Sequence, residues 1–246
     1  MSGAQRVMQT FGLFSAKRPT WTPEQAAKAL GISRASAYRY FAILTRAHFI
    51  ELASGRGYAL GPAIVELDRQ IRLGDPLILA AVDAMAALAK STGGAILLCR
   101  LYKGRVLCIH QERGARAPGL VSYERGRPVP LYRGATSKAI LAFLPRRELD
   151  VLIERDRAEI ARARLPTDGA ALQRLLEPIR EKRYCTTAAE VDPEACGAAV
   201  PLFERSRVIG SLSVALPFVA AKGAALERAT RLLVRAGHRI EAELDR

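Results

Sequence analysis

Acidic residues are scarce at the start of this 246-residue chain. Residues 1–62 contain eight Lys and Arg against two Asp and Glu, whereas residues 63–246 contain thirty against twenty-two. The formal net charge of the whole chain is +14. Such an excess favours polyanionic partners, above all nucleic acid or an anionic membrane surface. Because the excess is densest near the N-terminus, we expect the contact with such a partner there.

Long hydrophobic runs are absent as well. No apolar stretch approaches the roughly 18–20 residues that span a bilayer, and the sequence begins without the apolar segment and small-residue cleavage site of a signal peptide. We therefore expect no membrane partner. The predicted location is cytoplasmic and nucleoid-associated.

Cysteine and histidine are few and scattered. No CxxC pair occurs and no histidine has ligand spacing to a cysteine, so we expect no metal and no cofactor. In a reducing compartment the cysteines are expected to be buried free thiols. An enzyme with Cys196 or Ser211 as nucleophile needs a base, and no histidine forms a recognisable motif with either. We expect no catalytic residues; a redox sensor that pairs Cys99 with Cys108 across a hairpin stays open as an alternative.

Residues that interrupt helices and strands divide the chain into two domains. The first 60 residues are predicted to form three helices and a hairpin, and residues 62–74 a linker helix before a break at Asp75 and Pro76. Three short helices followed by a hairpin are typical of a winged helix-turn-helix. The expected domains are therefore 1–61 for nucleic-acid binding, the linker helix 62–74, and 75–246.

Capping residues set the bounds of the second and third helices. Thr22 is predicted to be an N-cap with Gln25 at the capping-box position, and Gly31 to end that helix. Ser33 is then expected to cap the third helix. The first helix is predicted from Val7, Met8, Phe11 and Phe14, which fall at helical spacing.

Residues 75–246 alternate between helical and strand patterns. We predict a helix to about residue 93, a hairpin over 95–111, a strand near 120–126, and a helix after "GATSKAILAFL". Charged helices near 146–163 and 170–183 follow, then strands near 183–190, 196–203 and 208–216, and a helix over 222–244. The fold class is α+β, with antiparallel hairpins and helices on the outside.

The third helix has one apolar face. Ala37, Tyr40, Phe41 and Leu44 recur at the spacing that packs inward. The opposite face is then left to residues that donate to phosphates and base edges, and an α-helix fits the DNA major groove. We expect DNA contacts from the caps, this face and the hairpin tip: Thr22, Ser33, Arg34, Ala35, Ser36, Tyr38, Arg39 and Arg56.

An ordinary solvated surface is the alternative for these arginines. No acid occurs between Ser33 and Arg46, whereas solvated helices usually mix signs. The hairpin tip strengthens the DNA interpretation, because Arg56 between Gly55 and Gly57 is placed to enter a minor groove or meet a backbone.

The sequence resembles the IclR-type transcriptional regulators over essentially its whole length. The likeness lies in "TPEQAAKALGISRASAYRYFAIL", "GYALGPAIVEL", "GRPVPLYRGATSKAILAFLP" and "EVDPEACGAAVPLFERSRVIGSLSVALP". The resemblance implies a bacterial, dimeric or tetrameric repressor or activator, with a winged helix-turn-helix, a linker helix and a GAF-like α/β domain that binds a small effector. Two departures stand out: Gly134-Ala135 and Ser137-Lys138 replace the usual Thr-Ala and Gly-Lys, and His48 replaces a glycine.

The resemblance also implies the position of the effector site. Carried over to matching positions, it points to Gly134, Ala135, Cys196, Ser211 and Ser213. A helix N-terminus suits a carboxylate, and Ser211 and Ser213 alternate with apolar residues, so both hydroxyls face one side of a strand. The effector is therefore expected to be a small organic acid.

Four further residues near this site have two open interpretations each. Cys196 is either a ligand contact or a buried small hydrophobe. Glu190 and Asp192 either accept from a ligand hydroxyl or lie on a surface loop, and Arg133 either neutralises an acid or points outward.

Overall fold

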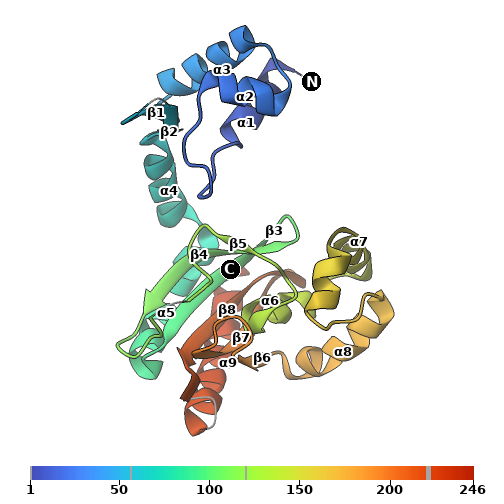
Figure 1. Cartoon of the computed structure of the whole chain (residues 1–246). Helices are drawn as coiled ribbons and strands as arrows, with labels where there is room; N and C mark the ends of the chain where they lie inside the picture. The colour runs from blue at the N-terminus through green and yellow to red at the C-terminus, as the bar shows by residue number, and fades with distance from the viewer. Residues whose placement is uncertain (1, 56, 120, 220–222) are drawn as a thin grey trace. The chain divides into compact units, whose positions relative to one another are not determined.

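The computed structural model describes residues 2–55, 57–119, 121–219 and 223–246. The chain divides into two compact units, Met1–Gly74 and Asp75–Arg246 (Figure 1). Each unit has its own hydrophobic core, so each is described by itself.

The first unit contains helices and a small sheet around one aromatic core. Trp21, Phe41 and Ile50 are buried there, with Phe41 and Tyr58 in edge-to-face contact at 5.1 Å between ring centroids. Two-stranded sheets are marginal alone, so packing against α3 holds the hairpin. The elements are α1 (Gly3–Phe11), α2 (Pro23–Leu30), α3 (Arg34–Arg46), β1 (Ile50–Ala53), β2 (Gly57–Leu60) and α4 (Ala63–Gly74).

The predicted caps of α2 and α3 are confirmed. Thr22 and Gln25 form a reciprocal capping box, and the Ser33 hydroxyl accepts from the Ser36 backbone N–H at 3.1 Å. Gly31 ends α2 with φ 62°, a left-handed conformation that favours glycine. His48, the departure noted above, has φ 57° in the same region, which explains why glycine suits its position.

The prediction for the first helix is wrong at its C-terminal end. α1 stops at Phe11, so Phe14 lies outside it, and Met8 is 65% exposed. Thr10 is buried instead, and its hydroxyl donates to the Arg6 carbonyl at 2.9 Å. Apolar spacing alone did not reveal this polar position on the inner face.

The second unit is built on a six-stranded antiparallel sheet with strand order β5-β4-β3-β8-β7-β6. No helix in the described part of the chain has the length and apolar composition needed to span a membrane. The strands are β3 (Ala95–Tyr102), β4 (Arg105–Arg113), β5 (Pro128–Val129), β6 (Cys185–Ala188), β7 (Ala195–Glu204) and β8 (Arg207–Pro217). The helices are α5 (Pro76–Thr92), α6 (Gly134–Leu141), α7 (Arg146–Arg162), α8 (Gly169–Lys182) and α9 (Ala224–Leu244).

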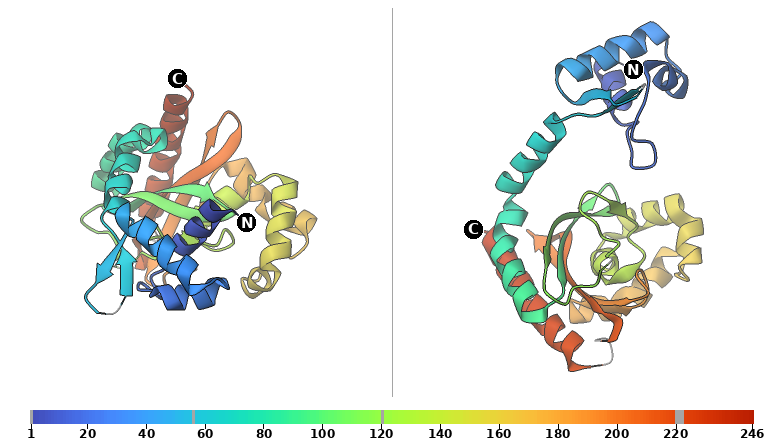
Figure 2. Two further views of the ribbon diagram at one scale, coloured as in Figure 1. Left: turned by 90° about the horizontal axis from the view of Figure 1, so that it is seen from above. Right: turned by 60° about the vertical axis from the view of Figure 1, so that its left-hand side comes forward.

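The two faces of this sheet are covered by different helices. α5 and α9 lie along one face, and α6 packs on β6, β7 and β8 on the other (Figure 2). Strand alternation assigns side chains to the faces: Leu212 and Val214 of β8 join the cluster under α5 and α9, whereas Ser211 and Ser213 meet α6. The predicted one-sided placement of these serines is therefore confirmed.

The strand predicted near residues 120–126 is wrong for the residues that the structure describes there. Residues 121–126 carry only an isolated bridge between Cys108 and Arg125. The Ser122 backbone N–H donates instead to Asp192 at 3.0 Å, so a side chain takes the place of a strand partner. The short strand that pairs with β4 is β5.

Asp75 stabilises the start of the second unit, and its removal tests this. Its Oδ1 accepts from the Leu77 backbone N–H at 2.9 Å and from Arg100 Nη2 at 2.7 Å. We expect Asp75→Ala to lower the free energy of unfolding of the second unit by about 1–2 kcal/mol. Asp75→Asn retains a capping acceptor and should cost about 0.5 kcal/mol.

Urea titration followed by far-UV circular dichroism measures this change. Trp21, the sole tryptophan of the chain, belongs to the first unit and gives an internal control by fluorescence. An Asp75→Ala protein whose far-UV transition matches the wild type would contradict the assigned cap.

Candidate functional site

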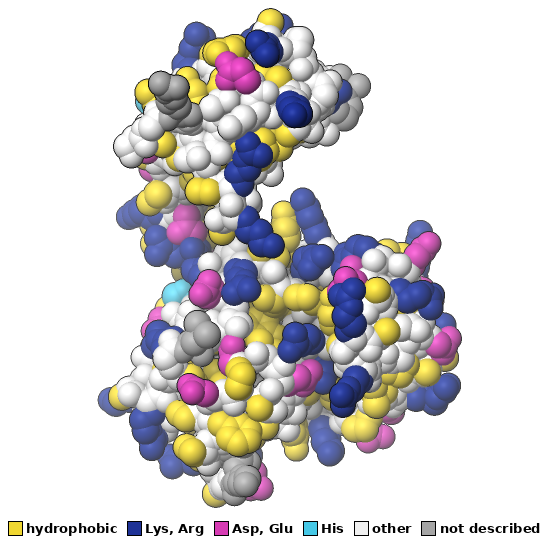
Figure 3. Space-filling view, viewed as in Figure 1, with side chains coloured by type: hydrophobic (Ala, Val, Ile, Leu, Met, Phe, Trp, Pro, Cys, Tyr) yellow, Lys and Arg dark blue, Asp and Glu magenta, His cyan; other side chains and the backbone are white. Residues whose placement is uncertain are grey.

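The exposed face of α3 carries most of the residues predicted to contact DNA. Ala37, Tyr40, Phe41 and Leu44 are buried as predicted. The opposite face exposes Arg34, Ala35, Tyr38 and Arg39, with Ser36 half-buried. Lys and Arg side chains are spread over the visible face of both units (Figure 3), so total charge does not single out this helix. What distinguishes it is a run of donors on one exposed helix face.

Glu24 of α2 contacts this face, which the local sequence did not reveal. The Tyr38 hydroxyl donates to the Glu24 carboxylate. This bond holds the pKa of Glu24 below its ordinary value and raises the pKa of Tyr38, and the nearby positive charge of Arg34 also lowers the pKa of Glu24. The face is therefore not free of acid, although none occurs within the helix itself.

The remaining residues predicted at this interface have different positions. Thr22 and Ser33 are N-caps of α2 and α3, so their hydroxyls already accept from backbone N–H groups. Their own positions at two helix N-termini are compatible with phosphate contacts. Arg56 lies outside the described residues.

The N-terminus of α6 is the centre of the predicted effector site. Gly134 starts the helix with φ 78°, and an added Cβ would lie 2.7 Å from the Tyr123 hydroxyl. The Gly134 backbone N–H donates to Glu190 Oε1 at 3.2 Å, and the Ala135 backbone N–H donates to the Thr187 hydroxyl at 3.1 Å. The protein's own side chains thus satisfy the helix donors that were expected to meet a ligand.

For Glu190 and Asp192 the sequence left open a ligand contact or a surface-loop position, and in the structure both carboxylates have partners within the chain. Lys138 Nζ lies 2.8 Å from Glu190 Oε1, and Asp192 accepts from the backbone N–H and the hydroxyl of Ser122. Arg133 donates to the Glu190 carbonyl at 2.8 Å rather than to a carboxylate. The chain therefore encloses this end of α6 with a loop that follows β6.

Buried hydroxyls join α6 to the sheet. The Thr136 hydroxyl donates to the Ser213 hydroxyl at 2.9 Å, and the Ser211 hydroxyl donates to the Thr136 carbonyl at 3.1 Å. The Tyr123 and Ser137 hydroxyls lie 2.8 Å apart, and burial raises the pKa of Tyr123. Ser137 occupies the position of the usual glycine, so this departure supplies a hydroxyl to the network.

A cavity of about 40 Å³ lies at this junction. Gly134, Ala135 and Ser213 line it, whereas Ser211 does not. Binding sites for small molecules usually measure about 300–1,000 Å³. A metabolite can therefore enter only when the surrounding residues move. The lining also includes residues that sequence reasoning did not assign to the site, among them Thr136, Thr187, Val191 and Ala215.

The thiol of Cys196 does not join the predicted effector residues. Cys196 borders the cavity, but its side chain belongs to the hydrophobic cluster under α5 and α9. Its partner in the sheet is Leu216, which belongs to the same cluster, and its thiol approaches the Pro217 carbonyl at 3.5 Å. Strand alternation places the thiol on the opposite face from Ser213, which fits the buried-hydrophobe interpretation of Cys196.

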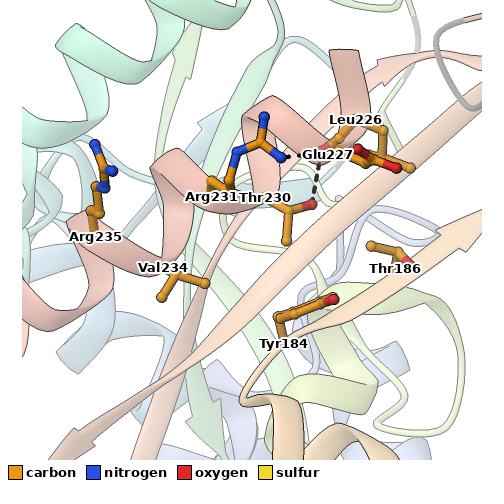
Figure 4. Close-up of a pocket in the computed structure, with 8 residues that line it drawn as sticks. All are labelled: Tyr184, Thr186, Leu226, Glu227, Thr230, Arg231, Val234 and Arg235. Carbon is orange, nitrogen blue, oxygen red and sulfur yellow. Dashed lines mark hydrogen bonds and ion pairs between the residues drawn. The ribbon is translucent and has the colours of Figure 1, made fainter. Parts of the chain in front are cut away.

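A larger groove lies on the α9 side of the sheet. It measures about 550 Å³, and Tyr184 and Thr186 face Leu226, Thr230 and Val234 across it (Figure 4). None of the residues predicted from the sequence lines this groove.

Two other sequence alternatives concern cysteine and metal. Cys99 and Cys108 lie opposite each other in the β3–β4 register, and both are buried free thiols. A hydrogen bond with Cys99 lowers the pKa of Cys108, whereas burial raises that of Cys99. Among the residues described, no group of three or more His, Cys, Asp or Glu is arranged to hold a metal ion.

Named relatives align with most of the chain. The transcriptional regulator KdgR of Escherichia coli is 26% identical, and the match covers 97% of this chain and 92% of the relative. The regulator KipR of Bacillus subtilis is 23% identical, with 80% of this chain and 79% of the relative covered. Both are named HTH-type transcriptional regulators.

Solved structures share the fold. A regulator from Silicibacter sp. TM1040 matches with a TM-score of 0.80 and 20% identity, covering 99% of this chain and 96% of its own. An IclR homologue from Microbacterium hydrocarbonoxydans, solved with 4-hydroxybenzoate, matches with a TM-score of 0.78 and 21% identity, covering 99% of both chains.

The family model for the C-terminal part of the bacterial transcriptional regulator IclR matches residues 75–242, more than half of the sequence. The chain therefore belongs to the IclR family of bacterial transcriptional regulators.

Proposed function

We propose that this chain is a sequence-specific DNA-binding transcriptional regulator whose operator binding responds to a small organic acid. The observation that carries the proposal is the exposed face of α3. Arg34 and Arg39 stand on it beside Ala35, which has little bulk to keep the helix away from a groove. A helix with such a face fits the major groove, with its N-terminal residues toward the base edges.

The first unit provides the frame for this helix, and we interpret it as a winged helix-turn-helix. α2 and α3 follow each other across Gly31, and the β1–β2 hairpin supplies the wing. The Tyr38 hydroxyl donates to Glu24. The negative charge of Glu24 lies near Arg34, so a phosphate that contacts this arginine would compete with Glu24 for its positive charge.

The linker helix α4 supports association of two copies. No residue of α4 is buried, yet it exposes large apolar side chains. Leu67 and Ile71 lie one turn apart, and Ile64 precedes them on the same side. An exposed apolar stripe of this kind needs a partner, and a second copy would set two recognition helices on two half-sites.

The second unit provides the effector site. We place a carboxylate at the N-terminus of α6, where backbone N–H groups and Lys138 offer positive charge. The complex of the Microbacterium homologue with 4-hydroxybenzoate supports an organic acid as ligand. A GAF-like domain of this kind would bind the acid better in one arrangement of the dimer and so shift the presentation of the α3 helices.

Removing two arginines from α3 tests the DNA interface. Arg34→Ala with Arg39→Ala should lower operator affinity about 10- to 100-fold and reduce the steepness of its salt dependence. Alone, Arg39→Ala should weaken binding to all DNA, whereas changes at Arg34 or Tyr38 should alter sequence preference.

Fluorescence anisotropy with operator and random duplexes at several salt concentrations measures these effects. The matched control replaces two exposed arginines of the second unit, Arg174 and Arg239, which removes the same charge. Equal losses in the two double variants would refute the assignment of α3 and leave only a general charge effect.

Charged substitutions on α4 test the proposed association. Leu67→Asp with Ile71→Asp should convert the oligomer to smaller species. The new carboxylates would lose water at the interface and would repel those of the other copy. Leu73→Asp is the control, since Leu73 is similarly exposed but lies about 160° around the helix from Ile71. Sedimentation equilibrium measures the mass; an unchanged mass for the double variant would exclude this face as the contact.

The effector is tested by gel shift on the DNA upstream of the protein's own gene. We expect small aromatic and aliphatic carboxylic acids to change operator affinity, and their uncharged amides to have no effect. A thermal-shift assay gives a second readout, because a ligand that binds the folded state raises the melting temperature. Stabilisation by sugars or nucleobases, with none by carboxylates, would overturn the proposed ligand class.

A further inference from the structure

Glu190 occupies the position in which the proposed function places a ligand carboxylate. Its Oε1 accepts from the Gly134 backbone N–H at 3.2 Å, and Lys138 Nζ lies 2.9 Å from its Oε2. A carboxylate therefore already spans a helix N-terminus and an ammonium group. Both side chains are partly exposed, 28% for Glu190 and 20% for Lys138, so solvent reaches this ion pair.

Glu190 also stands between the inner cavity and two outer pockets. It lines the 40 Å³ cavity at Gly134 and Ser213 together with Thr187. The same two residues line an outer pocket of about 590 Å³ beside α8, and Glu190 further lines one of about 540 Å³ beside Arg133. One side chain thus separates a space too small for a metabolite from spaces of ligand size.

The outer pocket beside α8 has the chemistry to receive an organic acid. Its apolar wall is formed by Leu165, Leu175 and Ile179, and Lys138 and Lys182 stand at its edges. An anion with an apolar body would find attraction for both parts there. A neutral or cationic ligand would gain less from the two lysines.

We propose that Glu190 is an internal stand-in for the effector: it fills the carboxylate subsite, and a monocarboxylic acid with an apolar body displaces it. This inference rests on the proposed function and names how its site is regulated. The incoming carboxylate takes over the Gly134 N–H and the Lys138 ammonium, while Glu190 turns into solvent. The exchange replaces one set of charge-assisted hydrogen bonds by another, so its free-energy cost is small compared with opening an unoccupied site.

The exchange has two consequences for specificity and response. When Glu190 leaves, the Lys138 ammonium loses its negatively charged partner. An uncharged analogue cannot supply a new one, so amides and esters are rejected. Departure of Glu190 also breaks the contact of its side chain with α6. The loop 189–194, which leads into β7, is thereby coupled to occupancy of the site.

Removing the stand-in and supplying a free carboxylate tests the proposal. Glu190→Ala leaves the Gly134 N–H and Lys138 without their partner, and acetate is the probe that restores it. We expect acetate to raise the melting temperature of Glu190→Ala by about 2–4 °C at roughly five times its Kd. Wild type should not respond, and neither acetamide nor sodium chloride of equal ionic strength should replace acetate.

Two variants serve as controls. Glu194→Ala makes the same change at an exposed position of the same loop and should show no response to acetate. Glu190→Ala combined with Lys138→Met should lose the response, which locates the acetate at this site. Should Glu190→Ala fail to fold, Glu190→Gln keeps the shape and is expected to bind benzoate about tenfold more tightly than wild type does.

The outcomes separate this inference from the proposed function. A melting temperature of Glu190→Ala that acetate raises no more than that of Glu194→Ala overturns the stand-in, as does an equal response of wild type. An operator gel shift with wild-type protein tests the function separately. If acetate rescues Glu190→Ala but no carboxylate changes operator binding, the subsite stands and effector control of DNA binding fails.

Discussion

The period-two alternation of side chains along β7 and β8 governs the second unit. Each strand supplies one row of residues to the hydrophobic cluster under α5 and α9 and the other row to α6. Because the two rows cannot exchange without shifting the register of the sheet, the apolar character of Leu212 and Val214 fixes Ser211 and Ser213 beneath α6. Two hydrogen bonds, from the Thr136 hydroxyl to Ser213 and from the Ser211 hydroxyl to the Thr136 carbonyl, then hold the start of α6 on the sheet. The geometry of the site thus follows from the packing of a core on the opposite face.

Helical periodicity sets a similar constraint in the first unit. Burial of Phe41 and Leu44 determines which side of α3 faces outward. The arginines of this face need no further contact to be exposed, and the acid that lies near Arg34 and accepts from Tyr38, Glu24, belongs to the neighbouring helix. The buried face and the exposed, donor-rich face of α3 therefore follow from one helical arrangement.

Local signals predicted much of this structure. Capping residues set the bounds of α2 and α3, and alternation correctly placed the serines of β8. One error is local, the C-terminal end of α1, and the others concern contacts between distant segments. Glu190 reaches Gly134 across 56 positions of sequence, and Ser122 reaches Asp192 across 70; no local pattern encodes such pairs. For Cys196 the sequence left two interpretations open, because its register with Leu216 depends on where β7 pairs with β8. The same distinction explains why the face of α3 was predictable and its contact with Glu24 was not.

Gly134 restricts how this site can change over evolution. The family resemblance implies threonine at the start of this helix, but here the backbone adopts φ 78° and a Cβ would meet the Tyr123 hydroxyl and Val191, each at 2.7 Å. A single step to the common residue would strain the backbone and collide with two neighbours. Substitution of Glu190 in the adjoining loop meets fewer restrictions, because its side chain is partly solvated and its backbone lies outside the left-handed region. On the proposed function, adaptation to a different metabolite would therefore begin at Glu190 and reach the helix start last.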